Sequence, residues 1–255
     1  MKVKSPYNSK LFGVLLLVFG VFGMLIIAHR LSYYVYEFDP QYSPVDYGKY
    51  NILSYFTVQS NFFGYVYLIA SALAVFGSKK AAKFAFSPFV GALAATYIFI
   101  AGLVYCCGIP LGFTPPSKWD TAAHAFSSFI QIYYHMIMPP FMIILWFFPS
   151  TDRRIHMKKA WLAGIYPFAY SIFSIIRGVC FPMHCYAYPF YNPQFVWETV
   201  FPGKDINYFG AFAIIAAMLA LGIMFFVGIC AAVIAIHNKR TAANAEQQKY
   251  TEDLI

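Results

Sequence analysis

Charged residues are scarce in this sequence, and their scarcity decides its broad class. Only 11% of the 255 residues are charged, whereas a soluble domain usually carries about a quarter. Hydrophobic residues make up 60% of the chain, and the mean hydropathy is +0.60. This balance excludes an ordinary soluble domain and predicts a protein that crosses a membrane several times.

Motifs for metal ions, nucleotides and nucleic acids are also missing. The five cysteines show no CxxC or Cys/His spacing, the histidines are not spaced as metal ligands, and there is no glycine-rich phosphate loop. We therefore expect no metal and no cofactor. The net charge of +8 resides in short connections between apolar runs, so it predicts membrane topology and contacts with anionic lipids rather than nucleic acid.

The cysteines leave one question open. Four of them lie towards one predicted membrane face: Cys106, Cys107, Cys180 and Cys185. They are either small apolar residues in or beside helices, or they include a disulfide-bonded pair.

Six apolar runs approach or exceed the roughly 20 helical residues that cross a bilayer core. They cover residues 11–28, 52–76, 86–107, 122–148, 160–180 and 208–236. We predict an all-α polytopic bundle of six transmembrane helices over residues 1–240, followed by a polar cytoplasmic tail at 241–255. The first run follows three lysines, as in a signal peptide, but it is long and no small-residue cleavage site follows it. We therefore expect it to be a retained span.

The basic residues predict the orientation of the bundle. With both termini inside, the outer loops hold only five of the 18 Lys and Arg residues, although these loops are longer: Arg30, Lys49, Lys118, Arg177 and Lys204. The asymmetry has the same sign at every crossing, as the positive-inside rule expects. We predict an N-in, C-in protein of the cell (plasma) membrane.

Three hydrogen-bonding side chains share one helical face near the start of the second run. Thr57, Ser60 and Asn61 stand at i, i+3 and i+4, so they stack one above another on a helix. In a bilayer this stripe must face protein or a water-filled cavity, and such clusters are functional candidates by default. Ser60 and Asn61 are expected either to support a developing oxyanion or to hydrogen-bond between helices.

His135 is the expected partner of this stripe, because it is the one histidine well inside an apolar run and a buried imidazole needs a partner. The predicted topology places Thr57 and His135 at similar depths in the outer half of the membrane. His135 either forms a hydrogen bond between helices or acts as a general base that takes a proton from a hydroxyl. Pro139 and Pro140 have no backbone amide protons, so the carbonyls one turn earlier lose their helical donors. Such a break occurs either at a plain kink or beside a cavity.

Two further residues are candidates for substrate contact. Tyr134 is adjacent to His135 in the sequence. Arg177 ends the fifth run at the outer face, where it either extends to lipid phosphates or binds a carboxylate with its planar guanidinium.

Three segments together resemble one family. They are Tyr55-Phe56-Thr57-Val58-Gln59-Ser60-Asn61, then Tyr134-His135 with Pro139, and Ile176-Arg177-Gly178 followed by Tyr188-Pro189-Phe190. They resemble prokaryotic six-span membrane proteins distantly related to two animal proteins, the androgen-induced protein and the androgen-dependent tissue-factor-pathway-inhibitor-regulating protein. The animal members are threonine hydrolases that cleave fatty-acid esters of hydroxy fatty acids. The resemblance implies Thr57 as the nucleophile and His135 as its base, although Gln59, Ser60 and Asn61 differ in part from the animal motif.

The leading expectation is therefore a membrane hydrolase of lipid-type esters that uses Thr57 and His135. Its partners would be membrane lipids and a lipophilic ester substrate. The alternatives are a non-enzymatic binding or transport subunit and a lipid acyltransferase. The sequence leaves the oligomeric state open.

Overall fold

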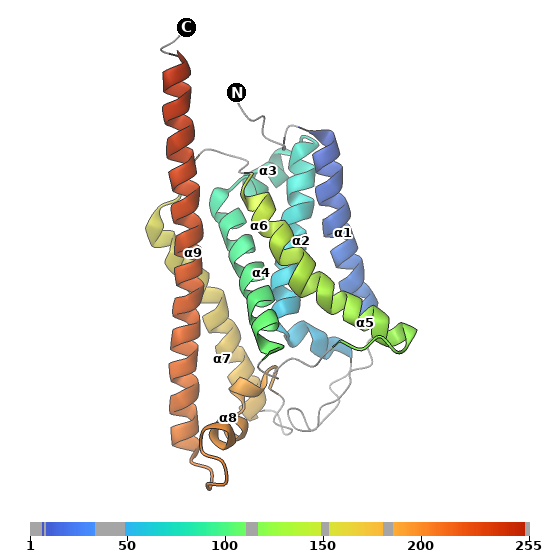
Figure 1. The fold of residues 1–255 in the computed structure, drawn as a ribbon, viewed down its shortest axis with the longest axis vertical. Coiled ribbons are helices and arrows are strands. Elements are labelled where there is room, and N and C mark those ends of the chain that lie inside the picture. The colour runs from blue at the N-terminus through green and yellow to red at the C-terminus, as the bar shows by residue number, and fades with distance from the viewer. Residues whose placement is uncertain are drawn as a thin grey trace. The chain divides into compact units, whose positions relative to one another are not determined.

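The fold is all-α, as predicted. The computed structural model describes residue 7 and residues 9–33, 49–110, 117–148, 153–180 and 186–252. Within these ranges the chain forms helices and no strand (Figure 1). Six helical stretches are long and apolar enough to cross a membrane, which makes the protein a multi-pass bundle: Lys10–Ser32, Phe56–Val75, Pro88–Gly108, Ala122–Trp146, Met157–Cys180 and Tyr208–Asn244.

The helical elements follow the predicted spans closely. In chain order they are α1 (Lys10–Tyr33), η2 (Lys49–Ser54), α2 (Phe56–Val75), α3 (Lys79–Ala85), α4 (Pro88–Gly108), α5 (Ala122–Ile132), η3 (Tyr133–Ile137), α6 (Met138–Trp146), η4 (Met157–Gly164), α7 (Ile165–Cys180), η5 (Pro189–Tyr191), α8 (Pro193–Val200) and α9 (Tyr208–Glu252). The element η3 is a π-helix, whereas η2, η4 and η5 are 3-10 helices.

One boundary differs from the sequence prediction. The second predicted span began at residue 52, but the 3-10 helix η2 runs to Ser54 and α2 starts only at Phe56. In the predicted polar tail, residues 241–252 are helical, because α9 continues through Glu252 without a break. Alanine, glutamine, glutamate and lysine are strong helix formers, so this polar sequence extends the helix beyond its apolar part.

The chain divides into two compact units. Unit 1 contains Met1–Ile27, Thr57–Ala160 and Ile229–Ile255. Unit 2 contains Ala28–Phe56 and Trp161–Gly228.

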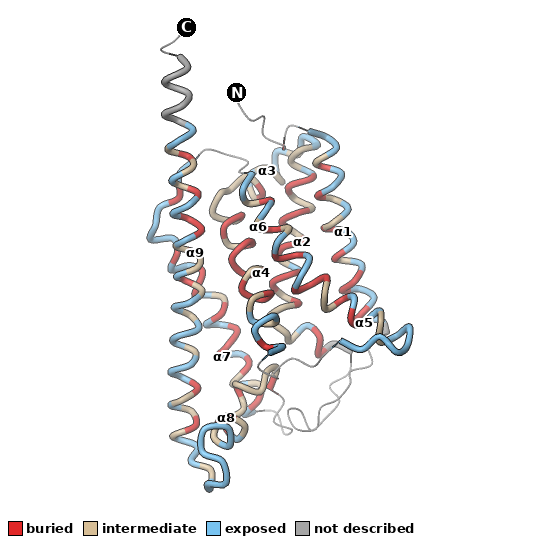
Figure 2. Tube along the Cα trace, viewed as in Figure 1, coloured by how far each residue is buried: buried red, intermediate tan, exposed pale blue. Residues whose placement is uncertain are grey.

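The interior of unit 1 lies along α2, α4 and α6, where Figure 2 shows buried residues concentrated. Tyr65, Leu68, Ile98, Met138 and Met142 are each almost completely buried. These large apolar and aromatic side chains form the packed framework that carries the functional candidates.

Local signals at the end of α2 explain how the chain turns there. Gly77 adopts a positive φ of 100°, which a residue without Cβ accepts readily. The Ser78 amide donates to the Leu73 carbonyl and the Gly77 amide to the Ala74 carbonyl, the two hydrogen bonds of a Schellman motif. Ser78 also caps α3, because its side chain accepts from the Ala81 amide.

Side chains of α9 fix the chain that follows α6 within unit 1. Arg240 donates to the Trp146 and Phe147 carbonyls, at 3.1 and 2.7 Å, and so satisfies the end of α6. Asn238 both accepts from the Ile155 amide and donates to the Ile155 carbonyl, at 2.8 and 2.7 Å.

Unit 2 is organised around tyrosines. Tyr170, Tyr186 and Tyr191 form a buried cluster against which Phe56 and Tyr188 pack. The Tyr170 hydroxyl donates to the Ser54 carbonyl at 2.6 Å. Burial raises the pKa of Tyr191, which lies outside the membrane-spanning helices, to about 12.

Candidate active site

Thr57 and His135, which lie far apart in the sequence, approach each other inside unit 1. Thr57 occupies the first turn of α2, and His135 is the middle residue of the π-helical segment η3. The distance from Thr57 Oγ1 to His135 Nε2 is 3.3 Å, within hydrogen-bond reach. The imidazole is buried, at 7% exposure, while Thr57 is only half-buried. The pair is therefore buried at the imidazole and partly exposed at the threonine.

The other ring nitrogen of His135 fixes the tautomer. His135 Nδ1 lies 2.9 Å from the backbone carbonyl of Gln131. A carbonyl oxygen only accepts hydrogen bonds, so Nδ1 carries the proton. In the neutral ring, Nε2 then presents its lone pair to the Thr57 hydroxyl, which donates to it. This is the protonation state that a general base requires.

The π-helical segment has a local cause in the sequence. Pro139 and Pro140 have no amide protons, so they cannot donate to the carbonyls four residues earlier, at His135 and Met136. The Met138 amide instead bonds to the Tyr133 carbonyl, five residues back, and α6 starts with the prolines in its first turn. Widened turns of this kind occur frequently at functional sites.

Residues of α4 surround the imidazole and its backbone. The Tyr105 ring stacks on the His135 ring, with centroids 3.8 Å apart and planes inclined by 12°. The Cys106 thiol lies 4.0 Å from the His135 carbonyl, which Pro139 leaves without a helical donor. His135 is thus contacted at both nitrogens, on its ring face and at its carbonyl.

Ser60 and Asn61 bond to the backbone of Thr57. The Ser60 hydroxyl and the Asn61 side-chain amide both donate to the Thr57 carbonyl, at 3.0 and 2.9 Å. The Tyr65 hydroxyl lies 3.4 Å from Asn61 Oδ1. The Ser60 and Asn61 side chains are completely buried, and their bonds to the Thr57 carbonyl favour a role in holding the first turn of α2. The two roles expected from the sequence were support of an oxyanion and hydrogen bonding between helices.

The remaining candidates divide between the two units. Tyr134 is buried in unit 1, and its ring meets that of His135 edge-on at 6.3 Å. Arg177 belongs to unit 2, where its Nη2 donates to Asn51 Oδ1 at 2.7 Å. This contact is with a neutral amide, and the two roles expected for Arg177, binding a carboxylate or extending to lipid phosphates, stay predictions.

The structure answers the cysteine question in part. Cys106, Cys107 and Cys180 are exposed free thiols, and Cys185 lies outside the described residues. Within the described ranges, no three histidine, cysteine, aspartate or glutamate side chains gather as metal ligands.

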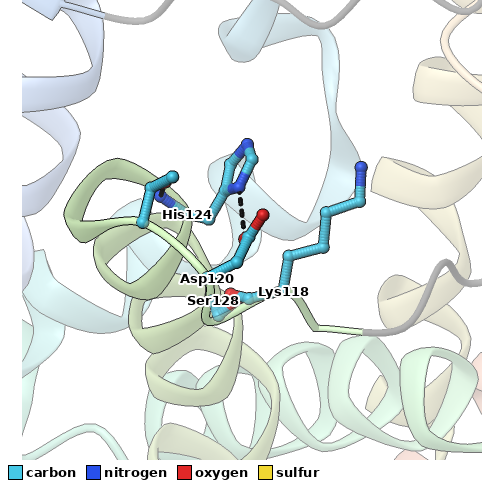
Figure 3. Close-up of polar contacts among 5 residues, drawn as sticks. Lys118, Asp120, His124 and Ser128 are labelled. Carbon is cyan, nitrogen blue, oxygen red and sulfur yellow. Dashed lines mark hydrogen bonds and ion pairs between the residues drawn. The ribbon is translucent and has the colours of Figure 1, made fainter.

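A second histidine lies near the start of the same span, as Figure 3 shows. His124 Nδ1 donates to Asp120 Oδ1 at 2.6 Å, and this hydrogen bond lowers the pKa of the Asp120 carboxyl. The two side chains are 33% and 69% exposed. The Thr121 hydroxyl accepts from the His124 amide, and Ser128 donates to the Lys118 carbonyl, so the pair belongs to the capped start of α5.

Sequence reasoning missed two groups that contact His135. One is the Gln131 carbonyl, which a sequence does not reveal because every residue has a carbonyl. The other is the Tyr105 ring, which is one of 21 tyrosines in the chain. Only the two prolines after His135 gave a signal that the backbone there is irregular.

No protein-family model, curated protein or solved structure matches the chain.

Proposed function

We propose that the protein is an integral membrane hydrolase of lipid-type esters, in which Thr57 is the nucleophile and His135 the general base. One observation carries the proposal: Thr57 Oγ1 lies 3.3 Å from His135 Nε2, while Nδ1 is held 2.9 Å from the Gln131 carbonyl. A hydroxyl, a base in the correct tautomer and a group that orients the base form the arrangement of a nucleophilic hydrolase. Here a backbone carbonyl takes the orienting place that a carboxylate holds in a serine triad.

In the acylation step, Thr57 Oγ1 attacks the carbonyl carbon of the ester and its proton moves to His135 Nε2. A bond from Oγ1 to carbon forms, and the carbonyl π electrons move to the oxygen as an oxyanion. When the oxyanion collapses, the bond to the leaving alcohol breaks, and the alcohol oxygen takes the proton from Nε2. The products of this step are a free alcohol and an acyl ester on Thr57.

In the deacylation step, water attacks the acyl-Thr57 carbonyl and gives a proton to Nε2. The bond from Oγ1 to carbon breaks, and Oγ1 regains the proton. A carboxylic acid leaves and the enzyme returns to its starting state.

In this proposal, the backbone amides at the start of α2 donate hydrogen bonds to the oxyanion. The first amides of a helix have no acceptor within the helix, and the positive end of the helix dipole lies there. Thr57 and Val58 lie in this first turn. The amide of the residue after the nucleophile plays this part in α/β-hydrolases as well.

The surroundings of the pair favour a lipophilic ester as the substrate. Met136 and Ile137 follow His135 directly in η3, and they are 42% and 36% exposed. Exposed apolar side chains on a membrane-spanning helix face acyl chains, so an ester with a long chain reaches the pair from the lipid phase. The N-in, C-in orientation and the plasma-membrane location remain part of the proposal.

The competing function is a non-enzymatic binding or transport subunit. The hydrogen bond between Thr57 on α2 and His135 on η3 favours it, because bonds between helices also serve to join a bundle. In that case the bond from Thr57 to His135 stabilises the bundle, and there is no turnover to lose.

The test uses the purified full-length protein in detergent or nanodiscs, a fluorophosphonate probe and a long-chain fatty-acid ester. We expect covalent labelling and ester cleavage by the wild type, and loss of both in Thr57→Ala with the fold retained. Labelling that persists in Thr57→Ala removes the assignment, and absence of labelling and cleavage in the wild type favours the binding subunit. Mass spectrometry of the products distinguishes hydrolysis from transfer of the acyl group to a lipid alcohol.

A further inference from the structure

Three residues of α4 face His135 together. Gly102, Tyr105 and Cys106 stand at i, i+3 and i+4, so they share one face of the helix. Tyr105 stacks on the imidazole, Cys106 lies against the His135 carbonyl, and Gly102 lies opposite the same carbonyl and Pro139. This face of α4 therefore lies against the ring of His135, its carbonyl and the adjacent Pro139.

Gly102 is required for the close approach of α4. A Cβ at this position would overlap the Pro139 ring and lie 2.7 Å from the His135 carbonyl oxygen. Both neighbours are rigid, one a backbone atom and the other a ring, so neither has the freedom of a flexible side chain to move away. Any side chain larger than hydrogen therefore pushes η3 and α4 apart.

Tyr105 restrains the plane of the imidazole. The hydrogen bond from Nδ1 to Gln131 fixes one edge of the ring but leaves it free to tilt about that contact. A parallel ring 3.8 Å away opposes such tilting, because the stack would have to open. Nε2 is thereby kept in the direction of Thr57 Oγ1.

We propose that this face of α4 is a positioning element for His135: Tyr105 holds the ring plane, and the absence of a side chain at Gly102 lets η3 approach. Neither residue exchanges a proton or forms a bond in the proposed reaction. The catalytic consequence rests on the proposed function, whereas the effect on the His135 ring does not. A shift of about 1 Å at a reacting group costs about 100-fold in rate, so small changes in ring placement are measurable.

The experiment combines NMR with the labelling rate, on full-length protein labelled at histidine with ¹⁵N and ¹³C. His135→Gln identifies the His135 signals by their disappearance. Four variants are compared with the wild type: Tyr105→Phe keeps the aromatic ring, Tyr105→Leu removes it, Gly102→Ala adds the clashing methyl group, and Val104→Ala is a control on an exposed position of the same helix.

In the wild type and in Tyr105→Phe we expect upfield-shifted His135 ring protons, a protonated Nδ1 and an unprotonated Nε2. In Tyr105→Leu the ring protons move downfield, and fluorophosphonate labelling at Thr57 slows by about 100-fold. Gly102→Ala moves the same signals and slows labelling, whereas Val104→Ala changes neither. Rescue by phenylalanine distinguishes ring positioning from a role of the tyrosine hydroxyl.

The proposal is overturned if Tyr105→Leu leaves the His135 ring protons where they were, or if it moves them without slowing the label. Tyr105→Leu decides the matter even if Gly102→Ala does not fold. If the ring protons respond as expected but the wild type never labels, the proposed function fails while α4 remains the element that orients the ring.

Discussion

His124 and His135 lie on or beside the same membrane-spanning stretch, and their surroundings differ in a way that matters for the proposed reaction. His124 has the conventional partner, the Asp120 carboxylate, but both side chains are substantially exposed, and the nearby Thr121 and Ser128 hydroxyls bond to backbone groups (Figure 3). His135 is buried, its orienting partner is a backbone carbonyl, and a threonine hydroxyl lies at its second nitrogen. In the proposed reaction, burial and a neighbouring threonine hydroxyl distinguish His135, and the carboxylate beside His124 does not have that role.

The two histidines should also differ in how much they contribute to the stability of the fold. An exposed ion pair contributes little to stability, because water and salt screen it. A buried ring whose nitrogens are both hydrogen-bonded contributes more, since removing it leaves a cavity and unsatisfied groups. Substitutions at the two histidines should therefore have very different effects.

The largest expected effect is that of His135→Ala. It removes a stacked ring and leaves the Gln131 carbonyl without its side-chain donor, so the free energy of unfolding should fall by about 3 kcal/mol. The matched substitution His124→Ala should cost about 0.5 kcal/mol or less. Thermal unfolding of both variants in the same detergent checks the difference, and equal losses of stability would contradict the expected contrast between the two histidines.

Asn61→Ala should come next, with a loss of about 2 kcal/mol, because it removes a fully buried donor to the Thr57 carbonyl and the acceptor of the Tyr65 hydroxyl. Ser60→Ala removes the second donor to the same carbonyl and should cost about 1 kcal/mol, since Asn61 still satisfies that oxygen. Denaturation of both variants tests the order. A larger loss for Ser60→Ala would show that the Asn61 amide is not the main support of this turn.

Thr57→Val should destabilise by about 1 kcal/mol, because it replaces the hydroxyl that bonds to His135 with a methyl group of similar size. Thr57→Ser keeps the hydroxyl and is the matched control for that bond. If the valine variant unfolds at the wild-type temperature, the contact between Thr57 and His135 adds nothing to the stability of the bundle.

The smallest effect concerns Asp120→Asn, and it should depend on pH. The His124 ring lowers the pKa of Asp120 in the folded protein, so the pair stabilises the fold above the ordinary pKa of an aspartate. This contribution is lost as the pH falls through the lowered pKa. We expect a slight destabilisation of the variant near neutral pH that disappears in acid. A difference that grows towards acid pH would contradict this sign.

The sequence was sufficient for the six spans, because long apolar runs between short basic connections leave few alternatives. It also identified His135 as the expected partner of the stripe that contains Thr57, since buried polar side chains need partners. Thr57 lies in the first turn of α2, which begins at Phe56, and from there its hydroxyl contacts His135.

The details around the pair could not be predicted in the same way. Two prolines signal an irregular backbone, but whether the helix kinks or widens depends on how closely α4 approaches. Ser60 and Asn61 had several acceptors available to them, and only the folded chain shows that both bond to the Thr57 carbonyl. The stack of Tyr105 on His135 is a contact between two helices, which no local pattern encodes.

The most direct measurement is the rate at which a fluorophosphonate modifies Thr57, with the modified residue located by peptide mass spectrometry, in wild type, His124→Ala and His135→Ala. We predict that the adduct forms on Thr57, that His124→Ala leaves the rate of adduct formation unchanged, and that a folded His135→Ala forms no adduct. An adduct on another residue, or equal rates in the two histidine variants, would contradict the assignment of Thr57 and His135.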